Sequence, residues 1–220
     1  MAILRISSAT ANNNTVTIGT HAENDSLLIF AYRDGSATAP TLPAGWYGLH
    51  TLGSGGFSGV IGWKRATSAI ETSGTWTNAT TLHAIVYRPG ADKIIVPVFL
   101  GANAGSTSAS PAVNGQPTGT FPTNQDDFWV GGWVAMRNSS NNLQSATWTG
   151  LSNVTSSTDG STWQVVVNDT NATRTTAWTN QSAPVANSAP WRSVTFGLLE
   201  VPTQSAGGGT FHPLQHPLIR

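Results

Sequence analysis

Ser26-Leu27-Leu28-Ile29-Phe30-Ala31-Tyr32 is a short, nearly continuous apolar run, and the turn residues Asp34-Gly35 follow it closely. A strand with one face in water alternates apolar and polar residues, whereas this run hardly alternates. Such a run is typical of a strand that is buried on both of its faces. We therefore expect a central strand over residues 26–32.

Outward from this run, further short segments rich in strand-forming residues are separated by Gly, Pro and Asn turn signals. Residues 46–52 and 57–65 are expected to pair across Gly53-Ser54-Gly55-Gly56. No segment has a convincing helical period, so we predict at least eight strands and no helix longer than about two turns. The other expected strands cover residues 2–6, 15–18, 82–87, 94–100, 128–136, 146–148, 162–167 and 193–201.

This series of strands predicts an all-β fold, most simply a jelly-roll-like antiparallel β-sandwich. A single domain over residues 1–202 is expected, because sandwiches often reach about 200–250 residues. Residues 101–125 are rich in Ala, Ser, Gly, Asn and Pro, and we interpret them as a long exposed loop or an insertion. Residues 203–220 are expected to form an extended C-terminal arm hinged at Gly207-Gly208-Gly209.

Two short segments have similar sequences, Ala146-Thr147-Trp148-Thr149 and Ala177-Trp178-Thr179. We interpret them as two similar strands rather than as a repeat unit.

Charged residues form only 9% of the chain, ten basic against ten acidic, and there is no cysteine. Disulfides and thiol chemistry are therefore excluded. The sequence has no basic patch for nucleic acid and no apolar run of the roughly 20 residues that span a membrane, so neither partner is expected. A surface with few charges suits proteins packed densely beside copies of themselves. Without a signal-peptide pattern, synthesis in a cytoplasm is expected.

Three stretches are familiar as sequences: residues 27–36 with Pro40-Thr41-Leu42-Pro43-Ala44-Gly45-Trp46, residues 71–80 with Val86-Tyr87-Arg88, and Trp191-Arg192-Ser193-Val194-Thr195. Together they resemble a widespread group of tailed-bacteriophage and prophage proteins, most closely over the first 90 residues or so. Members tend to be encoded among virion structural genes, often near tail genes. The resemblance implies a part of a virion without fixing which part. Because few charges, no cysteine and a hinged C-terminal peptide favour assembly over catalysis, we expect a non-enzymatic protein in the tail or adsorption apparatus or a head decoration protein. Its partners would be other virion proteins and copies of itself.

Nine tryptophans are spread along the chain, and most are expected in the core. The alternative for a few of them is a platform on which the apolar face of a sugar stacks. A carbohydrate-binding receptor-recognition module is therefore the alternative function, with host surface glycan as the partner. The residues expected in the core are Trp46, Trp76, Leu28, Phe30, Ile85, Val130 and Phe196, and the candidates for glycan stacking are Trp63, Trp148 and Trp178.

A glycan-cleaving enzyme is the less favoured reading, because it needs two facing carboxylates. Glu71 and Glu200 are conceivable partners, but nothing in their spacing selects them. We therefore expect no enzyme and no catalytic residue.

No cofactor and no metal site are expected either. His212 and His216 have the four-residue spacing of a helical zinc site, but Pro213 and Pro217 argue against a helix there. Asp126-Asp127 or Asp159-Gly160 fits a calcium site less well than it fits turn capping by aspartate side chains.

The C-terminal arm carries the apolar residues Phe211, Leu214, Leu218 and Ile219. Prolines keep such a peptide extended and lower the entropy lost on binding. We expect the arm to dock on another protein subunit; the alternative is that it folds back on its own sandwich.

Overall fold

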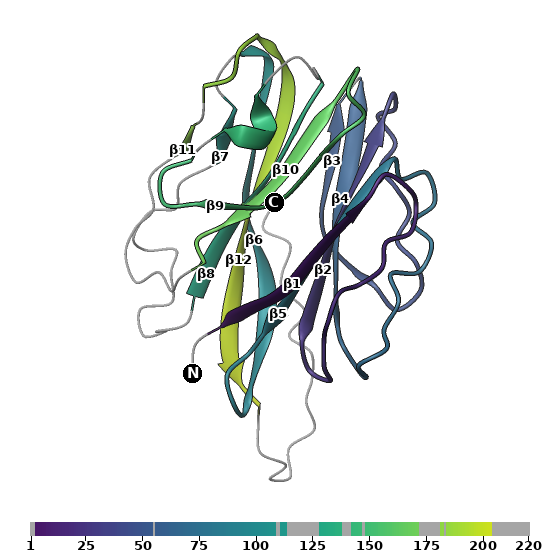
Figure 1. Cartoon of the computed structure of the whole chain (residues 1–220), viewed down its shortest axis with the longest axis vertical. Coiled ribbons are helices and arrows are strands. Elements are labelled where there is room, and N and C mark those ends of the chain that lie inside the picture. Colours follow the sequence, from purple (N-terminus) through teal and green to yellow (C-terminus); the bar gives the residue numbers. More distant parts are fainter. Residues whose placement is uncertain are drawn as a thin grey trace, which may run out of the picture.

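The computed structural model describes residues 3–54, 56–108, 111–113, 128–137, 142–146, 148–171, 181, 182 and 184–203. Two five-stranded antiparallel sheets pack face to face as a sandwich (Figure 1). The only helical element in this part of the chain is one 3-10 turn, Leu143–Ser145. The all-β prediction is therefore confirmed for the described residues.

The first sheet holds the first five strands in the order β1-β5-β2-β4-β3. All neighbours are antiparallel, and β2 lies at the centre between β5 and β4. The bounds are β1 Leu4–Ala11, β2 Ser26–Asp34, β3 Tyr47–Ser54, β4 Phe57–Arg65 and β5 Thr81–Arg88. The expected hairpin of residues 46–52 and 57–65 is confirmed as β3 and β4.

The second sheet has the order β6-β12-β8-β10-β9, again with antiparallel neighbours. Its strands are β6 Lys93–Ser108, β8 Phe128–Met136, β9 Ser152–Thr158, β10 Gln164–Asp169 and β12 Ala189–Pro202. The short strands β7 Ala112–Val113 and β11 Gln181–Ser182 pair separately from both sheets.

The strand order does not show the jelly-roll connectivity that we expected. A jelly roll is built from two Greek keys spread over two sheets. Here β1 to β5 stay together in one sheet, and the strands that follow build the other sheet. Each sheet is thus formed by one continuous half of the chain.

Four strand assignments from sequence differ from the structure. Residues 15–18, and residues 146 and 148 of the expected strand 146–148, are not in strands, although both segments hold buried apolar residues. Residues 101–108 continue β6 instead of opening a loop, because their backbone pairs with β12 regardless of their small side chains. Strand β9 was not expected, since its sequence Ser-Asn-Val-Thr-Ser-Ser-Thr has a single apolar residue.

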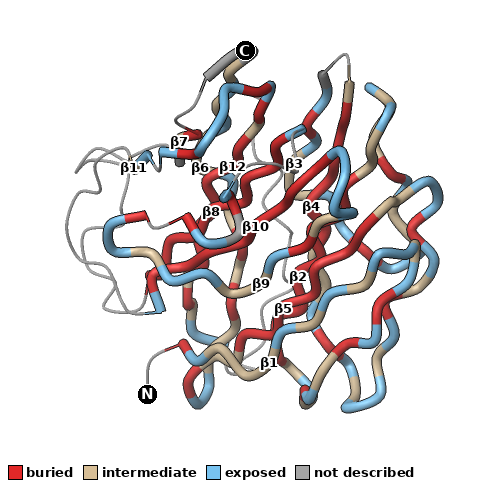
Figure 2. The backbone as a smooth tube through the Cα atoms, turned by 45° about the horizontal axis from the view of Figure 1, so that its top comes forward, coloured by how far each residue is buried: buried red, intermediate tan, exposed pale blue. Residues whose placement is uncertain are grey.

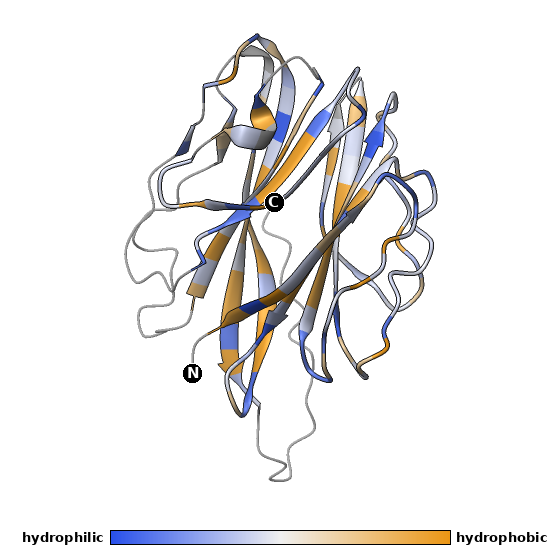
Figure 3. Cartoon of the chain, viewed as in Figure 1, coloured by the Kyte–Doolittle hydropathy of each residue, from blue (hydrophilic) through white to orange (hydrophobic). Residues whose placement is uncertain are grey.

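The main core lies between the two sheets. Phe30 of β2 is at its centre, with ring centroids 5.1 Å from Phe196 and 6.0 Å from Trp133 of the opposite sheet. Figure 2 shows buried residues concentrated along the inner strands, and Figure 3 shows the apolar residues concentrated on strands rather than turns. All seven predicted core residues are buried, four of them in this core: Leu28, Phe30, Ile85 and Phe196.

A second layer of apolar side chains covers the outer face of each sheet. On the first sheet, Trp46 and Trp76 pack over Leu27, Ile29 and neighbouring strand residues. On the second sheet, Trp148 and Leu143 pack with residues of β8 and β10. Strand β2 is therefore buried on both faces, as its sequence predicts. Trp76 lies in the connection before β5.

The edge formed by β1 and β9 is closed by polar contacts between the sheets. Asp169 of β10 accepts hydrogen bonds from Arg5 at 2.7 Å and from Tyr87 at 2.8 Å. Burial raises the pKa of Asp169, although both partners oppose the shift. His83 of β5 bridges Thr155 and Ser157 of β9 at 2.6 and 2.7 Å. These contacts fix the distance between the sheets along this edge.

Candidate functional site

The opposite edge of the sandwich, formed by β3 and β6, exposes aromatic side chains. Two ring pairs lie there, Tyr47 with Trp63 and His50 with Phe99. We call these four residues the aromatic edge. Tyr47 is 63% exposed and Phe99 is 42% exposed, so two large rings meet solvent at one edge.

A turn and a bulge set the start of β3. In Pro43-Ala44-Gly45-Trp46 the backbone N–H of Trp46 donates to the carbonyl of Pro43 at 3.3 Å, and Gly45 has a φ of +82°. Such a φ is left-handed and favours glycine. The buried ring of Trp46 anchors the turn on the outer face of the sheet. A register shift between Gly48 and His50 follows, where β3 gains a residue relative to β4.

Tyr47 and Trp63 are directly opposite each other on neighbouring antiparallel strands. Their ring centroids are 5.5 Å apart, with 35° between the ring planes. Trp63 is half-buried because it packs against the edge of the main core. The tryptophan is therefore held in place, while the tyrosine stands on the solvent side of the pair.

His50 and Phe99 pair across the two sheets. Their ring centroids are 4.0 Å apart and the planes differ by 5°, which is a stacked arrangement. Burial lowers the pKa of His50 below its usual value, so the neutral imidazole is favoured against the phenyl ring. The stack ties β3 to β6 where the core ends.

The aromatic edge offers ring faces and edges at a border between protein and water. Ring faces of this kind bind the apolar face of a sugar or an apolar side chain of a protein. The sequence analysis found Trp63 but missed Tyr47, His50 and Phe99. The only signal for them in the sequence is an apolar or aromatic residue at alternate positions, which equally predicts burial. Their exposure follows from β3 and β6 being edge strands.

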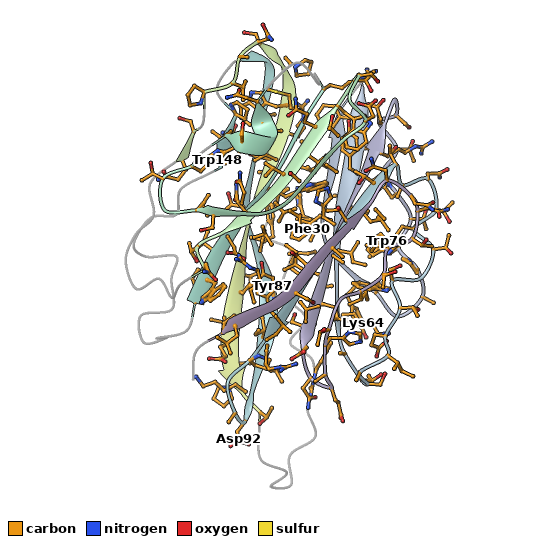
Figure 4. All side chains as sticks on the ribbon, in the orientation of Figure 1. Phe30, Lys64, Trp76, Tyr87, Asp92 and Trp148 are labelled. Atoms are coloured by element: carbon orange, nitrogen blue, oxygen red, sulfur yellow. The ribbon has the colours of Figure 1, made fainter. Side chains whose placement is uncertain are left out.

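Trp148, also proposed for glycan stacking, does not join this edge. Trp148 is 1% exposed and belongs to the outer layer of the second sheet, so it is a core residue in the structure. Figure 4 shows Trp148 on the far side of the sandwich from Trp76. Trp178 lies outside the described residues, as do the arm residues Phe211, Leu214, Leu218 and Ile219.

The structure does not bring Glu71 and Glu200 together. Glu71 follows β4, where the hydrogen bonds from Lys64 and Thr67 lower its pKa to about 2. Glu200 lies on β12 in the other sheet, where it accepts from Lys93 at 2.9 Å. Each carboxylate has its own cation, in contrast to the facing pair that glycoside hydrolysis needs.

Asp159 caps its own turn. Its carboxylate accepts from the backbone N–H groups of Ser161 at 2.9 Å, Thr162 at 2.7 Å and Trp163 at 3.1 Å. Burial raises the pKa of Asp159, but these hydrogen bonds outweigh burial and bring it below the usual range. The capping interpretation is confirmed for Asp159, whereas Asp126 and Asp127 lie outside the described residues.

No group of three or more histidine, aspartate or glutamate side chains that could hold a metal occurs among the described residues. His212 and His216 lie outside them. The same part of the chain contains no helix long and apolar enough to cross a membrane.

A groove of about 580 Å³ lies at the outer side of the first sheet, apart from the aromatic edge. Its lining comes from β1, residues 13–18 and residues 71–75, and consists mainly of Thr, Ser and Ala with Glu71. The ion pair between Glu71 and Lys64 explains the position of this carboxylate without a ligand.

Comparison of the chain with models of protein families, with curated proteins and with solved structures finds no match.

Proposed function

We propose that this chain is a non-enzymatic structural protein of a tailed-phage virion. It is exposed on the particle, in the tail or adsorption apparatus or as a head decoration protein, and protein–protein contacts hold it there. The observation that carries the proposal is the resemblance of residues 27–46 and 71–88 to virion-encoded proteins.

The charge arrangement supports this proposal. Ion pairs join five carboxylates to basic residues: Asp25 to Arg88, Asp34 to Arg137, Glu71 to Lys64, Asp169 to Arg5 and Glu200 to Lys93. These pairs occupy half of the chain's ten acidic residues. A surface with few charged residues, of which these are paired, produces little repulsion between neighbouring copies.

Mass spectrometry of particles of the phage or prophage that encodes the chain tests the proposal. We expect the protein in purified particles, many copies of it if it decorates the head and a few copies if it belongs to the neck or tail tip. Absence of the protein from infectious particles would overturn the proposal.

The C-terminal arm is the proposed anchor of the protein on the particle. A chain lacking residues 207–220 is expected to fold but not to join particles, because Phe211, Leu214, Leu218 and Ile219 would no longer bury their apolar surface against another subunit. Normal copy number of the truncated chain on particles would show that the arm is not the anchor.

A second candidate function is recognition of a host surface glycan by the aromatic edge. The observation that favours it is the exposed ring of Tyr47 backed by the half-buried Trp63 at 5.5 Å. A rigid aromatic platform at a protein surface binds sugars through their apolar faces.

Binding of the purified chain to host envelope polysaccharide tests this second candidate. Tyr47→Ala is expected to weaken binding about three- to tenfold, the usual effect of one aromatic contact. Ile70→Ala is the matched control, because Ile70 is 86% exposed and is not part of the aromatic edge. Equal binding by the wild type and Tyr47→Ala would remove the aromatic edge as a glycan site.

A further inference from the structure

The two sheets share one strand order. The strands of the first half, in chain order, are β1, β2, β3, β4 and β5; those of the second half are β6, β8, β9, β10 and β12. In space, both sheets read first, fifth, second, fourth, third. Both are antiparallel throughout. In this order, strands that are neighbours in the sheet are mostly not consecutive in the chain. The same non-consecutive order in both halves is therefore evidence of a relation between them.

Two short sequence motifs also recur at equivalent places. Trp46-Tyr47-Gly48-Leu49 includes the start of the third strand of the first half, and Trp148-Thr149-Gly150-Leu151 directly precedes the third strand of the second half. Trp76-Thr77-Asn78 lies between the fourth and fifth strands, as does Trp178-Thr179-Asn180 in the second half. The two copies of each motif are 102 residues apart, from 46 to 148 and from 76 to 178.

The tryptophan of the first motif has the same structural role in both halves. Trp46 packs on the outer face of the first sheet, and Trp148 packs on the outer face of the second sheet. Figure 4 shows the outer layers, marked by Trp76 and Trp148, on opposite sides of the sandwich with Phe30 between them. The similarity between the sequences around Trp148 and Trp178 therefore relates two different motifs of the second half, not equivalent positions of the two halves.

The halves also pack reciprocally. Strand β1 lies beside β9, and β3 lies beside β6. The first strand of each half thus meets the third strand of the other half. Reciprocal contact of this kind is the property of an isologous interface between two copies related by a two-fold axis.

We infer that the chain is an internal duplication, a dimer of two five-stranded units joined in one polypeptide. The units meet through their inner faces and are related by a pseudo-two-fold axis between the sheets. The turn after β5, residues 89–92, is the junction. The second unit has gained β7 and β11 and has longer first and fifth strands.

The position of the chain ends agrees with this inference. In each unit the first strand begins beside the end of the fifth, with Leu4 opposite Arg88 and Lys93 opposite Pro202. The short junction joins the end of β5 to the start of β6. A two-fold axis then places the end of β12 near the start of β1, and both lie at the lower end of the molecule in Figure 1.

In a duplicated chain the two long edges of the sandwich, β1 with β9 and β3 with β6, are equivalent positions. Their side chains have diverged. Hydrogen bonds between β9 and the side chains of His83, Thr81 and Asn12 close one of these edges. The other carries the aromatic edge, of which Tyr47 is replaced by Thr149 in the repeated motif. Among the described residues, the aromatic edge therefore has no equivalent at the other long edge.

A circular permutant tests the inference with every residue kept. Residues 91–220 are followed directly by residues 1–90, so the second unit precedes the first. Each unit keeps its internal sequence separations, which set the folding rate of small proteins. We expect a wild-type circular dichroism spectrum and a refolding rate within about threefold of the wild type.

The matched control is a permutant opened between Gly55 and Gly56, with residues 56–220 followed by residues 1–55. It is also cut between two consecutive strands, but it separates β3 from β4 and divides the first unit. Its refolding is expected to be about tenfold slower or more, because pairing within the unit becomes long-range. Failure of the first permutant to fold, or equal refolding rates of the two permutants, would overturn the inference.

Discussion

Trp76 joins two connections over the outer face of the first sheet. Its indole N–H donates to the carbonyl of Ser73 at 3.0 Å, and its backbone N–H donates to the carbonyl of Asn14 at 2.8 Å. The ring meets Trp46 edge-on, with 5.3 Å between ring centroids. Trp76 therefore holds the connections that contain Asn14 and Ser73 against the outer face of the sheet.

Trp76→Ala is expected to lower the free energy of unfolding by about 3–5 kcal/mol, the usual range for a fully buried tryptophan. Urea titration followed by circular dichroism measures the change. Ile70→Ala, at an exposed site, should change it by less than about 0.5 kcal/mol. A loss below about 1 kcal/mol for Trp76→Ala would contradict a structural role for this ring.

His83 is a buried neutral histidine. Burial lowers its pKa from 6.5 to about 3, and both ring nitrogens lie within hydrogen-bond distance of hydroxyl groups of β9. Between these two pKa values the unfolded chain binds a proton at this position and the folded chain does not. The contribution of His83 to stability is therefore present above the unfolded pKa and is lost as the pH falls toward the folded value.

We expect the free energy of unfolding to fall by up to about 1.4 kcal/mol per pH unit from this group between about pH 6 and pH 5. In His83→Gln this part of the slope should disappear, whatever the overall stability of the variant. His50 and Glu71, whose pKa values are also lowered, are unchanged in His83→Gln, so the difference between the two slopes reports His83. Equal slopes in the two proteins would show that His83 is not buried in the neutral form.

At the scale of elements, β4 illustrates how one strand serves two apolar layers. Gly59 lies under the Trp133 ring in the main core, and Gly62 lies under the Trp76 ring in the outer layer. A Cβ atom on Gly59 would lie 2.1 Å from Cη2 of Trp133 and 2.8 Å from the carbonyl oxygen of Ala31. The glycines of β4 thus leave space for tryptophans on both of its faces.

Gly59→Ala is expected to destabilise the fold by about 1–3 kcal/mol, because the added methyl group overpacks the core. Gly48→Ala is the matched control in the neighbouring strand, where the nearest side-chain atom to a new Cβ would be 3.9 Å away. Urea titration of both variants measures the difference. Equal stability of the two variants would mean that Trp133 shifts without cost.

At the scale of the whole molecule, the two halves share one core. Leu28, Phe30 and Ile85 of the first sheet pack against Trp133, Val194 and Phe196 of the second. Neither sheet buries its inner face without the other, although each has an outer layer of its own. The interface between the halves is therefore the main core of the protein.

Unfolding is expected to be a single transition for both halves. Far-ultraviolet circular dichroism and tryptophan fluorescence should give the same urea midpoint, since separation of the sheets exposes the shared core at once. Two resolved transitions would show that each half is stable by itself.

The sequence by itself determined the fold class, the position of β2 and the burial of all seven expected core residues. It also predicted the β3–β4 hairpin and the capping role of Asp159. These features depend on local patterns, because the spacing of apolar residues and the turn preferences of Gly, Pro and Asp act over a few neighbouring positions.

Only the tertiary structure decided which strands lie at the edges and which segments cover the sheets. Trp63 and Trp148 are both tryptophans, yet Trp63 is half-buried beside the edge strand β3 and Trp148 is buried in the outer layer of the second sheet. Strand β9 and residues 101–108 form strands because neighbouring backbones pair with them, not because of their side chains. A local pattern predicts that a residue favours burial or a strand. Which segment packs over that residue depends on parts of the chain that are distant in sequence.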